Sequence, residues 1–115
     1  MVQPFHLAIP VTNLTDAEAF YGELLGCEKG RSDSQWIDWN FFGHQLVTHC
    51  VEVMPSPPSY NGVDDHAVPV PHFGVVLTMS DWQALANKLE TANTEFVIAP
   101  YIRARYPCAA HPDDR

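Results

Sequence analysis

The chain has 115 residues, of which 46% are hydrophobic, so it is long enough and apolar enough to bury a core of its own. Its formal net charge is −8 at pH 7, which argues against a nucleic-acid partner because phosphates would be repelled. No apolar run approaches the ~18–20 residues that span a bilayer, and the N-terminus lacks the pattern of a signal peptide.

The cysteines indicate a reducing compartment. Cys27, Cys50 and Cys108 are odd in number and lack the spacing of a metal-binding motif. Such a set fits the cytoplasm better than a disulfide framework does. We therefore expect a soluble, acidic, cytoplasmic protein that forms one domain over residues 1–115 and has no nucleic-acid or membrane partner.

The first predicted strand covers residues 3–11. Leu7 and Ile9 fall on one face, and His6 and Ala8 fall on the other. This period of two is typical of a strand with one packed face. We therefore expect His6 to project away from the apolar core.

A helix is predicted to follow this strand. Thr15 and Glu18 have the spacing of a capping box, in which each side chain accepts a hydrogen bond from a backbone N–H near the other. The apolar positions continue to about Leu25, and Gly26 is expected to end the helix, because glycine readily adopts the left-handed conformation found after helix ends.

Three short strands are predicted after the helix, over residues 27–31, 35–41 and 44–53. Gly43 is expected to turn the last two into a hairpin, since a tight turn between strands favours glycine. Residues 1–53 therefore read as one βαβββ module.

A long connection is predicted over residues 54–71. This stretch contains five prolines and one glycine. Proline removes a backbone donor and glycine loosens the chain, so we expect no sheet structure here.

The second half of the chain repeats the first. Residues 72–78 read as a strand that opens with His72, as the first strand opens near His6. Ser80 and Gln83 have capping-box spacing, and the helix that they begin is expected to run to about Thr91. Repeats of this size indicate two similar modules, with function where they meet.

The end of the chain does not complete this repeat. Residues 95–99 read as a short strand, and residues 104–115 show no alternation and are expected to form an irregular tail. The second module, residues 72–103, is therefore expected to be partial.

Several segments together resemble the glyoxalase/bleomycin-resistance/extradiol-dioxygenase group, also called the vicinal oxygen chelate superfamily. They are Gly43–Val47, Val68–Val76 and Phe96–Ile98, together with the two opening histidines. The resemblance covers roughly residues 3–103 and implies an α+β fold, in which two βαβββ modules curl into a cup-shaped, partly open barrel. Relatives continue for two more strands, so we expect the second module to be incomplete at its C-terminal end.

The resemblance also implies a divalent metal ion: Fe, Mn, Ni or Zn. His6 and His72 match the ligand positions on the first strand of each module. His49 is a third candidate, because the superfamily often takes a ligand from the end of the first module. Glu52, the carboxylate near the end of the same strand, is a weaker candidate, and no residue is assigned as catalytic.

Two functions follow from this resemblance. The first is a metal-dependent lyase, isomerase or dioxygenase-like protein that acts on a small oxygen-chelating substrate. The second is a non-catalytic small-molecule binding protein of the drug-sequestering type. Because an incomplete sheet exposes an unpaired edge, we also expect a homodimer.

Overall fold

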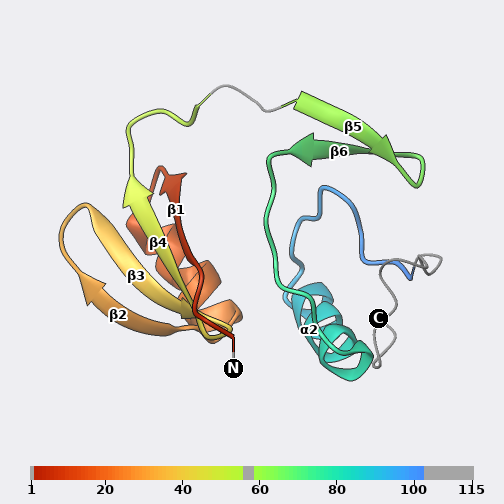
Figure 1. Ribbon diagram of the computed structural model, residues 1–115, viewed down its shortest axis with the longest axis horizontal. Helices are drawn as coiled ribbons and strands as arrows, with labels where there is room; N and C mark the ends of the chain where they lie inside the picture. The colour runs from red at the N-terminus through yellow and green to blue at the C-terminus, as the bar shows by residue number, and fades with distance from the viewer. Residues whose placement is uncertain (1, 56–58, 103–115) are drawn as a thin grey trace. The chain divides into compact units, whose positions relative to one another are not determined.

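A computed structural model describes residues 2–55 and 59–102 of the chain (Figure 1). The chain divides into two compact units, Met1–Ser56 and Pro57–Arg115. The architecture is α+β, with a mixed four-stranded sheet in the first unit and a two-stranded sheet in the second. No helix in the described parts of the chain is long and apolar enough to cross a membrane.

The first unit has the predicted βαβββ order. Its elements are β1 (His6–Val11), α1 (Leu14–Ala17), η1 (Glu18–Leu24), β2 (Glu28–Ser32), β3 (Trp36–Phe41) and β4 (His44–Cys50). The strands lie in the order β1-β4-β3-β2, with β1 parallel to β4 and the other neighbours antiparallel. The first strand therefore pairs with the last, so the four strands form one sheet with β1 and β2 at its edges.

The helical segment begins two residues earlier than the sequence predicts. Asn13 is the N-cap, and its side-chain oxygen accepts a hydrogen bond from the backbone N–H of Asp16 at 3.0 Å. Thr15, predicted as the cap, lies inside the helix, because Asn13 has the extended backbone that a cap requires and an equally suitable oxygen. Gly26 follows the helix with a φ of +73°, as predicted.

The helical segment covers one face of the sheet in the first unit (Figure 1), and the core of side chains lies between them. Ile37, Trp39 and Leu46 form its buried centre. Thr48 is fully buried beside them, where its hydroxyl accepts a hydrogen bond from the Trp39 indole N–H at 3.1 Å and donates one to the Ile37 carbonyl at 3.3 Å. This apolar face leaves the opposite face of the sheet for polar side chains.

The second unit contains a hairpin that the sequence did not predict. Strands β5 (Ser59–Val63) and β6 (His66–Val70) pair antiparallel inside the stretch expected to lack sheet structure, so that prediction is wrong. Asp64 and Asp65 adopt φ values of 51° and 62°, which suit a tight hairpin turn. The prolines are tolerated because a two-stranded sheet consists only of edge strands.

The helix of the second unit forms as predicted, but it begins at a different cap. Helix α2 (Met79–Thr91) ends where expected, but its N-cap is Thr78, whose hydroxyl accepts from the Asp81 N–H at 3.2 Å, and not Ser80. Thr78 has the extended backbone of a cap, and Ser80 already lies within the helix.

The strands predicted over residues 72–78 and 95–99 do not form. A strand needs a partner for its backbone N–H and C=O groups, and no described segment pairs with either of these. The predicted irregular tail, residues 104–115, lies outside the described residues.

Candidate functional site

A row of polar side chains crosses the sheet of the first unit on the face away from the core. His6 pairs with Gln45, Gln45 with Asn40, and Asn40 with Glu28, so the four residues occupy matched positions on four strands. Paired residues in a sheet project from the same face. We call these four residues the polar row.

The imidazole of His6 is oriented by a neighbour in the polar row. Its Nδ1 lies 2.9 Å from the Gln45 side-chain oxygen Oε1. An amide oxygen only accepts hydrogen bonds, so Nδ1 is the donor and Nε2 of the neutral ring keeps its lone pair. The His6 side chain is exposed, as the strand alternation predicts. Its Nε2 is therefore available as a metal ligand or as a base.

His72 is oriented in the same way within the second unit. Its Nδ1 lies 2.7 Å from the backbone carbonyl oxygen of Pro69, which can only accept. This places the proton of the neutral ring on Nδ1 and the lone pair on Nε2. Metal-bound histidines commonly donate their other ring N–H to an oxygen in this manner, because the bond fixes the ring and its tautomer. Both histidines therefore fit the chemistry of a metal ligand.

His49 lies on the same sheet face as His6 but at the other end of β4. It pairs with Pro10, whereas His6 pairs with Gln45, so four strand positions separate the two histidines. Four positions correspond to about 13 Å along a strand, whereas two imidazole nitrogens bound to one ion lie within about 4 Å of each other. The register of β1 and β4 therefore does not bring His49 to His6.

The other titratable groups of the first unit do not complete a metal cluster. Glu52 is exposed beyond the end of β4, and Nδ1 of His44 accepts a hydrogen bond from the Phe5 N–H at 2.8 Å. Within residues 2–55 and 59–102, no three His, Cys, Asp or Glu side chains gather in a way that could hold a metal ion.

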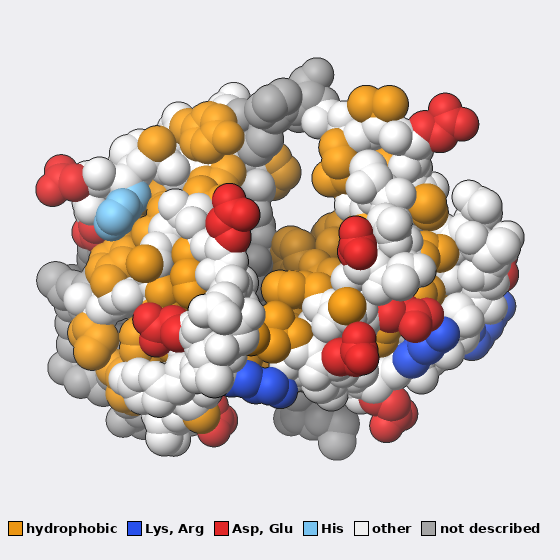
Figure 2. All heavy atoms as spheres, turned by 180° about the vertical axis from the view of Figure 1, so that it is seen from behind, with side chains coloured by type: hydrophobic (Ala, Val, Ile, Leu, Met, Phe, Trp, Pro, Cys, Tyr) orange, Lys and Arg blue, Asp and Glu red, His pale blue; other side chains and the backbone are white. Residues whose placement is uncertain are grey.

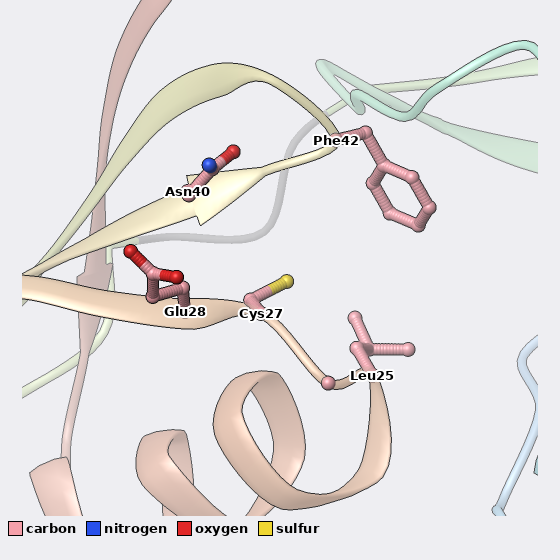
Figure 3. Close-up of a pocket in the computed structure, with 6 residues that line it drawn as sticks. Leu25, Cys27, Glu28, Asn40 and Phe42 are labelled. Atoms are coloured by element: carbon pink, nitrogen blue, oxygen red, sulfur yellow. The ribbon is translucent and has the colours of Figure 1, made fainter.

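A pocket of about 280 Å³ lies at one end of the polar row, beside the turn between β3 and β4 (Figure 3). It is lined by Leu25, Gly26, Cys27, Glu28, Asn40 and Phe42. Burial raises the pKa of the Cys27 thiol, so this side chain stays neutral at physiological pH. Glu28 is therefore the one charged side chain among these lining residues.

No local pattern in the sequence predicts this pocket. Its polar members, Glu28 and Asn40, come together only through the pairing of β2 with β3, and its apolar members come from the end of the helix and from the hairpin turn. Figure 2 shows more acidic than basic side chains on the face that it displays, in line with the net charge of −8.

Neither a protein-family model nor a curated protein matches this sequence. Solved structures do match. A glyoxalase/bleomycin resistance protein/dioxygenase from Alicyclobacillus acidocaldarius is 28% identical, with a TM-score of 0.62 over 79% of this chain. An integron cassette protein from the mobile metagenome of Halifax Harbour sewage outfall is 24% identical, with a TM-score of 0.60 over 80% of this chain.

A third match, a virulence protein from Salmonella typhimurium, is 18% identical, with a TM-score of 0.55 over 91% of this chain and 79% of its own. The present chain spans 64% of the length of the Alicyclobacillus protein and 72% of the cassette protein. The α+β fold and the likeness to the Alicyclobacillus protein confirm the resemblance seen in the sequence. The chain is therefore similar in fold to the glyoxalase/bleomycin-resistance/dioxygenase group, the vicinal oxygen chelate superfamily.

Proposed function

We propose that His6 and His72 are ligands of a divalent metal ion and that the protein is a metal-dependent lyase, isomerase or dioxygenase-like protein for a small oxygen-chelating substrate. The observation that supports this proposal is the hydrogen-bonding pattern that the two rings have in common, each within its own unit. Each donates its Nδ1 proton to an oxygen and keeps the lone pair on Nε2. A bound metal ion would act as a Lewis acid toward the substrate oxygens.

The donor chemistry suits such an ion. Neutral imidazole is a good ligand for Zn, Ni and Fe. The Gln45 amide and the Pro69 carbonyl hold the two rings, so less conformational freedom is lost when a ligand binds. A catalytic metal usually has about three protein ligands and a water molecule, so this proposal requires a further donor. The register of β1 and β4 keeps His49 away from His6, so His49 is a candidate only for an alternative ligand set, His49 with His72, that does not include His6.

Elemental analysis of protein purified without chelator or affinity tag tests the metal proposal. It is paired with thermal melts in Ni, Co, Mn, Zn and Fe(II). We expect near-stoichiometric metal that His6→Ala and His72→Ala each remove. His49→Ala tests whether His49 is a ligand in place of His6, because this variant lowers metal content only if His49 binds the ion. Absence of bound metal, with no melting shift beyond that of the double variant of His6 and His72, would refute the proposal.

The second candidate function is metal-free binding of small molecules. It is favoured by the lack of a three-residue ligand group among the described residues and by the pocket at the end of the polar row. Small-ligand binding is compared, in the presence of chelator, between the wild type and the variant that carries both His6→Ala and His72→Ala. Equal affinity in the two supports metal-free binding. Loss of binding when the metal is removed supports the metal-dependent function.

We also propose that the protein forms a homodimer in the cytoplasm. Strands β1 and β2 are the edges of the four-stranded sheet, and an open edge offers unpaired backbone groups to a second copy. Cys27 and Cys50 are free thiols, which suits a reducing compartment. Light scattering checks the oligomer, since one copy has a mass of 12.9 kDa. A measured mass of 12.9 kDa, that of one copy, at every accessible concentration would contradict the dimer.

A further inference from the structure

We infer that the pocket beside the β3–β4 turn binds a small organic ammonium ion with an apolar body. The pocket lies wholly within the first unit and combines three kinds of surface (Figure 3). Glu28 contributes a carboxylate, Phe42 an aromatic ring, and Leu25 an aliphatic wall. Its volume of about 280 Å³ suits a ligand of modest size.

The charge of Glu28 is not neutralised by a described residue. The nearest residue in sequence with a positive charge, Lys29, forms an ion pair with Glu18 at 2.9 Å. Lys29 projects from the opposite face of β2, toward the helix, because it pairs with Trp39 whereas Glu28 pairs with Asn40. Glu28 makes no ion pair within the described part of the chain, so its carboxylate is available to a cationic ligand.

Phe42 adopts a backbone conformation that a phenylalanine disfavours. Its φ is 53°, and that of Gly43 is 89°, so the two residues form a turn with two positive φ values. Asn-Gly is the preferred pair for such a turn, and a bulky residue at the first position strains it. The Phe42 side chain nevertheless lines the pocket and is 41% exposed. Strain that persists at a ligand-accessible aromatic residue points to a binding role.

The remaining polar groups favour a cation over an anion. The Asn40 side-chain oxygen accepts a hydrogen bond from the Gly43 N–H at 2.8 Å and so supports the turn. The Cys27 thiol stays neutral because it is partly buried. The pocket therefore offers one negative charge and an aromatic ring, which together suit an ammonium group, and the net charge of −8 adds a favourable long-range field.

Nuclear magnetic resonance titration of the ¹⁵N-labelled full chain tests this inference. The probe is 2-phenylethylammonium chloride at low ionic strength, with 2-phenylethanol as the neutral control and 3-phenylpropionate as the anionic control. We expect the ammonium ion to shift the backbone amides of residues 25–28 and 42–43. We expect the alcohol to bind about fivefold more weakly, since an exposed ion pair contributes roughly that much, and the carboxylate not to bind.

Three variants separate binding from folding. Glu28→Gln is expected to lower ammonium affinity about fivefold, to the level of the alcohol. The matched control Glu23→Gln, an exposed carboxylate outside the pocket, is expected to leave it unchanged. Phe42→Asn is expected to raise the melting temperature, because asparagine tolerates positive φ, and yet to weaken binding.

Three results would each overturn the inference. The first is equal affinity for the ammonium ion and the alcohol. The second is ammonium affinity that Glu28→Gln does not change. The third is a set of shifted amides that excludes residues 25–28 and 42–43. Because neither metal nor His72 takes part in the titration, the outcome is independent of the proposed metal site.

Discussion

Replacing Thr48 by valine removes the two buried hydrogen bonds of its hydroxyl from the core of the first unit. Valine has nearly the shape of threonine but no hydroxyl. Thr48 is 0% exposed and Trp39 is 3% exposed, so water cannot replace the lost acceptor of the indole N–H. An orphaned buried donor costs about 1–3 kcal/mol. We therefore expect Thr48→Val to lower the free energy of unfolding by about 2 kcal/mol and the melting temperature by about 8 °C.

Urea denaturation followed by tryptophan fluorescence measures this loss, and a double-mutant cycle assigns it. Trp39→Phe removes the indole N–H, so Thr48→Val should cost much less in that background than in the wild type. A loss below about 0.5 kcal/mol in the wild type, or an equal loss in both backgrounds, would refute the role of the hydrogen bond.

Three further predictions concern the helix cap, the first histidine and the partly buried thiol of Cys27. Asn13→Ala removes the side-chain cap and should lower the free energy of unfolding by about 1 kcal/mol, measured by urea denaturation; an unchanged midpoint would contradict the assigned cap. Gln45→Leu frees the His6 ring and should weaken metal binding about tenfold in calorimetric titration, whereas Gln45→Glu should retain it; equal affinities in both variants would exclude an orienting role. Burial raises the pKa of the Cys27 thiol, so its alkylation by iodoacetamide, in a background without the other cysteines, should require higher pH than that of a model thiol. Because the pKa of Cys27 is raised in the folded state, stability should fall as pH rises above the ordinary thiol range; a reaction profile that matches the model thiol would contradict this.

The first unit was predictable from the sequence because its signals are local. Alternation around Leu7 marks β1, Gly26 ends the helix, and Gly43 forms the turn between β3 and β4. Each of these signals depends on the conformational preference of one residue or on a short period. The caps were displaced because Asn13 and Thr78, each two residues before the predicted cap, compete with it.

The second unit was less predictable because strands depend on partners. Proline counts led to the wrong prediction for the hairpin over residues 59–70, in which each strand needs only one paired edge. Residues 72–78 have the alternation of a strand, but alternation supplies no hydrogen-bond partner. Propensity therefore indicated where a strand is possible and not whether one forms.

The candidate site shows the same division between local and long-range information. His6 and His72 could be selected from the repeat, and their roles as ligands stay predictions. The orientation of His6 by Gln45 depends on the parallel register of β1 and β4, which no local pattern specifies. The pocket was missed for the same reason, since Glu28 and Asn40 meet only through strand pairing.

The pairing of β1 with β4 also has a consequence for the order in which the first unit folds. Strands β2, β3 and β4 are joined by short turns, so they can pair soon after synthesis, whereas His6 must wait for a partner 39 residues later in the chain. Closing that loop is entropically the most expensive step, so we expect β1 to join last. Kinetic φ-values near zero for substitutions in β1, and higher values in β3 and β4, would report this order. The orientation of His6 would then be acquired only in the final step of folding.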